Sequence, residues 1–168
     1  MIFTRRHLVA SAASALFLFI AAPLQAQDQQ GEPSLLPVHE ERLVIETSEG
    51  SFDYSVELAL NGRDRASGLM FREQMDDDHG MLFRFEEPRQ ITMWMRNTLI
   101  PLDMIFIRGD GTVAGHHADA VPLSEAVIAS PEPVLFVLEL NAGKAEEMGL
   151  AEGDRVSHPI VAEAAGAQ

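Results

Sequence analysis

The sequence predicts a mainly β fold, a compact antiparallel barrel or sandwich of about 7 to 9 short strands with two short helices. Apolar or alternating runs of strand length recur along the chain and are separated by Gly, Pro, Asn and Asp. No long amphipathic helix connects these runs, which argues against a parallel sheet with helical crossovers. The chain has no cysteine, so packing rather than disulfides must stabilise it.

The first strands form a predicted hairpin. Residues Leu43 to Ile45 are β-rich, and a Ser-Glu-Gly-Ser turn separates them from residues 52–60, whose alternate positions are apolar. A short helix should follow, with Asn61 as its cap and Asp64 in its first turn. Residues 81–85 then predict a buried strand.

The stretch from Ile91 to Ile107 is the most informative part of the chain. It contains the only Trp, Trp94, and in a strand Met93 and Met95 would lie on the same face. Residues 97–101 predict a connector, and residues 102–107 a central strand that is apolar except for Asp103. Gly-Asp-Gly at 109–111 indicates a tight hairpin turn.

The C-terminal part predicts one buried strand and one further helix. Residues 134–140 are apolar except for Glu139, and Asn141 is the expected cap of a helix ending at Met148. A last strand is expected over residues 155–161.

The chain divides into four predicted parts. Residues 1–26 have two arginines, a short apolar core and a small residue at the end, as in a cleaved signal peptide. Residues 27–41 predict a flexible arm, 42–161 a single β-rich domain, and 162–168 a disordered tail. We therefore expect an exported, periplasmic protein. Arg5-Arg6 also fits a twin-arginine signal, so both export routes stay open.

The charge excludes some partners. The formal net charge is −14, which opposes binding to nucleic acid or to an anionic membrane surface. We expect no nucleic-acid partner, and no stable membrane insertion once the signal is cleaved. No motif in the sequence predicts a cofactor.

Six short motifs occur in an order that resembles a known family. They are Gly68-Leu69-Met70-Phe71-Arg72, Gly80-Met81-Leu82-Phe83, Trp94-Met95-Arg96-Asn97-Thr98, Ile100-Pro101-Leu102-Asp103, Val137 to Gly143 and Gly153-Asp154. The series, which spans about residues 42–161, resembles the prokaryotic family labelled domain of unknown function 192. Arg96 stands where that family often has Lys. The resemblance implies a small, mostly β, often exported domain without established activity, and no catalytic residues.

Polar residues embedded in apolar strands form the candidate ligand-binding site. Burying a carboxylate costs several kcal/mol unless it is paired, so Asp103 and Glu139 need partners, and Arg72 and Arg96 are candidates. Three readings stay open: a structural network in which Asn97 and Asp103 bind loop backbone, a pocket floored by Trp94, and an acid/base enzyme. The candidate residues are Arg72, Trp94, Arg96, Asn97, Thr98, Asp103 and Glu139.

The sequence thus favours a non-enzymatic envelope accessory protein, or one that binds a small polar ligand or an envelope protein, and leaves catalysis open. One alternative is an enzyme acting on envelope glycan through Asp103 and Glu139. Another is Cu(I) handling by methionine, since thioethers prefer Cu(I). Methionine is also ordinary core filler. No metal site is predicted from other residue types.

Overall fold

A computed structural model describes residues 31–166. The predicted signal peptide at 1–26 lies outside these residues. The strands are β1 (Leu43–Thr47), β2 (Gly50–Ala59), β3 (His79–Arg89), β4 (Thr92–Met93), β5 (Leu102–Ile107), β6 (Val113–Ala120), β7 (Ile128–Ala129), β8 (Val134–Asn141) and β9 (Arg155–Ser157). The helices are α1 (Gly62–Ser67), α2 (Lys144–Glu147) and α3 (Pro159–Gly166). The fold is mostly β, as predicted.

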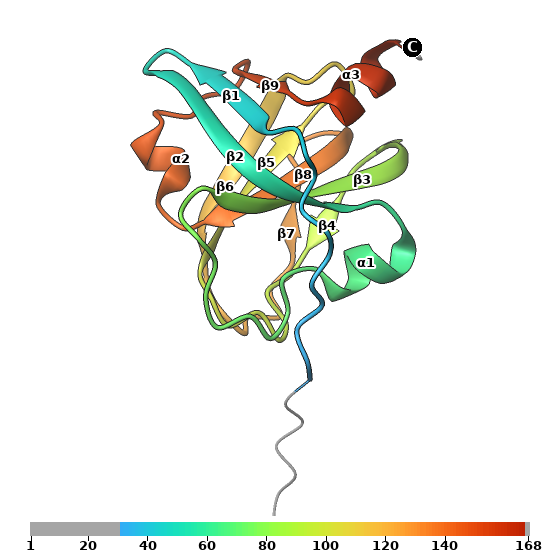
Figure 1. The fold of residues 1–168 in the computed structure, drawn as a ribbon, viewed down its shortest axis with the longest axis vertical. Coiled ribbons are helices and arrows are strands. Elements are labelled where there is room, and N and C mark those ends of the chain that lie inside the picture. The colour runs from blue at the N-terminus through green and yellow to red at the C-terminus, as the bar shows by residue number, and fades with distance from the viewer. Residues whose placement is uncertain (1–30, 167–168) are drawn as a thin grey trace, which may run out of the picture.

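Seven strands form one curled sheet in the order β6-β5-β8-β3-β2-β1-β9 (Figure 1). Its pairs are antiparallel except for β2 and β3, which run parallel. The two edges approach each other where Thr112 bridges Arg155 and the Val113 amide donates to the Asp154 carbonyl. The sheet is therefore a half-barrel that closes at one end. The pair β4 and β7 forms a separate ribbon.

Each face of the sheet has its own apolar core. Along β8, Phe136, Leu138 and Leu140 pack into the concave core with Leu43, Ile45 and Ile105. The alternate residue Val137 packs on the opposite face, in a core that includes Met81, Phe83 and Met104. In Figure 1, α1 lies near β4, and α3 lies beside β9. Within the described residues, no helix has the length and apolarity needed to cross a membrane.

Several local predictions are confirmed. Residues of β1 and β2 pair as an antiparallel hairpin, and the Asn61 side chain accepts hydrogen bonds from the Arg63 and Asp64 amides at the start of α1. Strand β5 is buried on both faces, as its composition predicted.

Other local predictions are wrong. Asn141 does not cap α2, whose N-cap is Gly143, because its amide instead donates to the Met75 and Asp76 carbonyls. Strand β4 is only two residues long, so Met95 lies outside it. Strand β9 ends at Ser157 rather than Val161.

Residues 162–166, expected in a disordered tail, continue helix α3. Pro159 opens this helix, a position where a missing N–H costs nothing, and the His158 ring accepts from the Ile160 amide. Ile160, Val161 and Ala164 are buried against the concave core. The apolar face therefore gives the segment a reason to fold.

Residues 31–41, the described part of the predicted flexible arm, meet the sheet. The His39 amide donates to the Val56 carbonyl at 2.8 Å, and the Leu36 amide donates to the Glu57 carboxylate at 2.7 Å.

Asp103 is predicted to be a major stabilising residue. It is fully buried, and its two carboxylate oxygens accept from the Asp119 amide at 2.9 Å and the Ala145 amide at 2.7 Å. Asp103→Ala leaves both amides without a partner, so we expect it to lower the free energy of unfolding by about 2–4 kcal/mol. Urea unfolding measures this loss. Asp76→Ala, at an exposed position, is the control, and an equal effect in both variants would contradict the role of Asp103.

Candidate functional site

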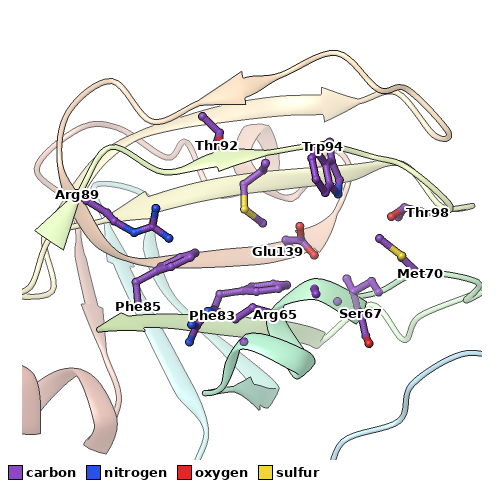
Figure 2. Close-up of a pocket in the computed structure, with 15 residues that line it drawn as sticks. Arg65, Ser67, Met70, Phe83, Phe85, Arg89, Thr92, Trp94, Thr98 and Glu139 are labelled. Carbon is purple, nitrogen blue, oxygen red and sulfur yellow. The ribbon is translucent and has the colours of Figure 1, made fainter. Parts of the chain in front are cut away.

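A cavity of about 290 Å³ lies on the convex face of the sheet, between β3 and β8 on one side and α1 and β4 on the other. Aromatic and apolar side chains make up about half of its wall, and hydroxyl, guanidinium and carboxyl groups make up the rest (Figure 2). The lining side chains include Arg65, Met70, Phe83, Phe85, Arg89, Met93, Trp94, Thr98 and Glu139. Such a mixture is typical of small-molecule sites.

The carboxyl group of Glu139 lies at the floor of the cavity. Its strand β8 pairs on both sides, with Met81 of β3 and Met104 of β5 directly opposite Glu139. The residue is 4 % exposed, and its carboxyl makes no hydrogen bond to another residue within 31–166. Figure 2 shows the group directed into the cavity, between Phe83 and Trp94.

The protonation of Glu139 follows from this environment. Burial raises its pKa to about 8, and the charge of Arg72 offsets only part of the rise. At neutral pH the group is therefore mostly a neutral carboxylic acid. In that form it can donate one hydrogen bond and accept others.

Local chain geometry forms the wall beside α1. Gly68 ends α1 with φ of +48°, a conformation that glycine adopts without strain. A side chain at that position would meet the Phe83 ring at 3.4 Å. Glycine thus lets the chain turn closely over Phe83 and present Met70 to the cavity.

The opposite wall is a loop with Trp94 at its centre. Met95 is fully buried and its amide donates to the Ser124 carbonyl at 2.9 Å, which anchors the loop to the segment before β7. Asn97 has φ of +59°, and its carbonyl accepts from the Phe71 amide at 2.8 Å. Asn adopts this left-handed conformation more readily than most residues other than glycine, so the turn suits the residue at this position.

Guanidinium groups stack on the aromatic rings of the site. The Cζ atoms of Arg65 and Arg89 each lie 5.2 Å from the centroid of Phe85, and that of Arg96 lies 5.4 Å from the centroid of Trp94. These distances fit cation–π contacts. Arg65 also pairs with Glu86.

Residues 43–158 match the profile of "Uncharacterized ACR", the family labelled domain of unknown function 192 (DUF192). The chain belongs to the DUF192 family. This confirms the resemblance seen in the sequence.

Two solved structures resemble this DUF192 chain. One is a Sinorhizobium meliloti 1021 protein described as "a putative transcription regulator", with 50% identity and a TM-score of 0.70, covering 74% of this chain and 97% of that one. The other is a Novosphingobium aromaticivorans DSM 12444 protein of unknown function, with 37% identity and a TM-score of 0.69, covering 74% of this chain and 94% of that one. No curated protein matches the chain.

Three of the seven candidate residues predicted from the sequence meet in the DUF192 cavity: Trp94, Thr98 and Glu139. Arg96 stacks on the outside of Trp94 and is exposed. Asn97 supports the loop through its backbone, and its side-chain nitrogen lies 3.9 Å from the Met70 sulfur. These two residues thus flank the cavity rather than line it.

Asp103 is not part of the cavity. It pairs across the ladder with Leu140, so it lies on the opposite face of the sheet from Glu139, and backbone amides occupy both of its oxygens. This is the structural reading that the sequence left open. The two carboxyl groups therefore do not form an acid/base pair.

Arg72 has a different partner from the expected ones. Its guanidinium binds both carboxylate oxygens of Glu57, at 2.6 and 2.7 Å, and the Ser34 carbonyl at 2.6 Å. His79 also contacts Glu57, at 2.9 Å. The expectation that Arg72 or Arg96 pairs with Asp103 or Glu139 is wrong.

Glu57 is the residue that sequence reasoning missed. Burial raises its pKa, but hydrogen bonds from Arg72, His79 and the Leu36 amide outweigh this effect and hold the pKa below its ordinary value. The alternation of β2 put apolar residues on one face and left Glu57 on the other, so the pattern did not mark Glu57 as buried. The available signal was Arg72, a charged residue in an apolar context that required a carboxylate.

Methionine side chains divide between core and cavity. Met81, Met95 and Met104 are fully buried, whereas Met70 and Met93 line the cavity. Within residues 31–166, His, Asp and Glu side chains form no group of three or more that could hold a metal ion.

The raised pKa of Glu139 predicts a specific pH dependence of stability. Between its ordinary pKa of 4.5 and about 8, the unfolded chain releases the proton that the folded chain keeps. The free energy of unfolding should therefore fall as pH rises through this window. We expect Glu139→Gln to lack this component, so that its stability relative to wild type increases steadily from pH 5 to pH 8.

Urea unfolding at several pH values tests this expectation. Glu46→Gln, at an exposed position on β1, is the matched control and should follow the wild-type curve. A constant difference between Glu139→Gln and wild type across the range would contradict the prediction.

Proposed function

We propose that this protein binds a small ligand that has an apolar body and at least one polar group, and holds it in the cavity above Glu139. The observation that carries the proposal is the carboxyl group of Glu139, which is buried, without a partner among the described residues, and directed into the cavity. The carboxyl oxygens are accessible from the cavity rather than enclosed, since the buried side-chain atoms without a partner within residues 31–166 are those of Arg72 and His158. A ligand in the cavity can therefore form a hydrogen bond with this group.

The cavity walls define the rest of the ligand. Phe83, Phe85 and Trp94 offer ring surface, and Met93 offers an adaptable thioether. The volume of about 290 Å³ lies near the lower end of the range for ligand sites, roughly 300–1,000 Å³. These features support a compact ligand that is mainly apolar, with a hydroxyl, carbonyl or acid group facing Glu139.

Binding is better supported than catalysis. Among residues 31–166, Glu139 is the single carboxyl group that lines the cavity, and a glycan hydrolase of the usual kind needs two carboxyl groups near one bond. Asp103 faces the other side of the sheet, so the hypothesis of a glycan-acting enzyme lacks a second carboxyl group.

The place and partners of this binding activity are also proposed. Export would put the cavity in the periplasm, where the ligand would be an envelope metabolite or part of an envelope protein. The regulator description of the S. meliloti relative is not carried over to this chain, because a net charge of −14 opposes contact with nucleic acid.

Ligand binding is testable through Trp94, the only Trp of the chain. We expect at least one probe in a panel of small alcohols, amides and carboxylic acids to give a saturable change in its fluorescence. Glu139→Met removes the polar partner while keeping the side-chain volume similar, and should lower the affinity for that probe about tenfold. Glu46→Gln should bind as wild type does.

Chemical shifts of backbone amides provide a second readout, because Trp94 is 52 % exposed and its emission can be insensitive. If no probe changes either signal while the protein is folded, the binding proposal fails.

A second candidate, Cu(I) handling, is favoured by the two thioethers of Met70 and Met93 in the same cavity. Thioethers are soft ligands suited to Cu(I). On this candidate, anaerobic titration against a chromogenic chelator should show uptake of one equivalent. The double substitution Met70→Leu and Met93→Leu should abolish that uptake.

The matched control for the copper titration is Met75→Leu. Met75 packs against the core on the convex face but does not line the cavity. Absence of stoichiometric uptake by wild type would eliminate the copper candidate.

A further inference from the structure

The cavity has one end that is positively charged. Phe85 is 7 % exposed, and the guanidinium groups of Arg65, from α1, and Arg89, from the end of β3, both contact its ring. Figure 2 shows Arg89 and Phe85 at one end of the cavity, with Trp94, Thr98 and Met70 towards the other. Both arginines line the cavity.

One carboxylate accompanies these two cations. Arg65 pairs with Glu86 and also donates to the Leu60 and Arg84 carbonyls, so its position is fixed. Arg89 has no carboxylate within 4.0 Å in the described part of the chain, and its guanidinium is free to bind another group. The end of the cavity therefore carries about one uncompensated positive charge.

This positive charge is unusual for a chain with a net charge of −14. Most basic residues in the described chain are used in ion pairs. Those without one are Arg63, Arg89, Arg96 and Arg155, and two of these four stack on rings of the site. The acidic surface would repel a dissolved anion, so a local cation is needed to hold one.

We propose that the ligand is a small organic carboxylate whose charged group binds Arg89 and Arg65 beside Phe85, while its apolar body extends along Phe83 towards Trp94. This inference rests on the proposed binding function. A guanidinium fork matches the two oxygens of a carboxylate. The single uncompensated charge matches a monoanion better than a doubly charged phosphate ester.

Glu139 is compatible with an anionic ligand only in its protonated form. An ionised carboxylate on the cavity floor would repel the charged group of the ligand, whereas the neutral acid carries no charge that opposes it. Affinity for the anion should therefore decrease as pH rises above the Glu139 pKa of about 8. Affinity for a neutral ligand has no such requirement.

The test measures by calorimetry the binding of three probes that share an alkyl chain and differ in their head group: octanoate, octanol and octylamine. We expect octanoate to bind wild type at least tenfold more tightly than octanol, as a charge-assisted contact of about 1.5–3 kcal/mol implies. Octylamine should bind more weakly than both. Raising the pH from 7 to 9 should lower the affinity for octanoate and leave the affinity for octanol unchanged.

The decisive variant is Arg89→Gln, which should remove the preference for octanoate over octanol. Arg63→Gln is its matched control, because Arg63 also lacks an ion pair among the described residues but does not line the cavity. It should keep the wild-type preference.

The outcomes separate the two proposals. Equal affinities for octanoate and octanol, tightest binding of octylamine, or equal effects of Arg89→Gln and Arg63→Gln would overturn the carboxylate inference while leaving a binding cavity. Binding of none of the three, nor of any probe in the fluorescence panel, would overturn both.

Discussion

Strand β8 constrains the rest of the structure, because it is paired on both sides and its residues from Val134 to Leu140 are all buried. A strand without access to water needs an apolar cover on each face. Curling of the sheet supplies the concave cover, completed by α2 and α3. The convex cover comes from Leu69 in the loop after α1 and from the segment around β4, with Ile91, Met95 and Ile100, and it leaves the cavity above Glu139.

Three buried carboxyl groups near this strand are accommodated in three ways. Asp103 has a backbone amide donating a hydrogen bond to each of its two oxygens. Glu57 stays charged through a bidentate arginine and a histidine. Glu139 has neither kind of partner, and it remains protonated instead. This difference in solvation, rather than residue type, separates the candidate ligand group from two structural ones.

Short-range patterns predicted the elements, and long-range pairing decided the site. Alternation identified the β1–β2 hairpin, and Asn61 identified the start of α1, because both depend on neighbouring residues. The parallel pairing of β2 with β3 and the contact of Arg72 with Glu57 depend on the fold of the whole sheet. Because both carboxyl groups stand in apolar strands, the sequence predicted that Asp103 and Glu139 belong to one site. The register of the strands instead puts them on opposite faces of the sheet.

The ribbon of β4 and β7 has a consequence for the rate of ligand exchange. Its ladder consists of two residue pairs and is separate from the seven-stranded sheet. Opening such a small element breaks few backbone hydrogen bonds, so it requires much less free energy than unfolding the sheet. In the proposed binding function, a ligand would therefore leave by local opening of this wall while the seven-stranded sheet stays intact. Its residence time and the lifetime of the fold would then be controlled by different segments of the chain.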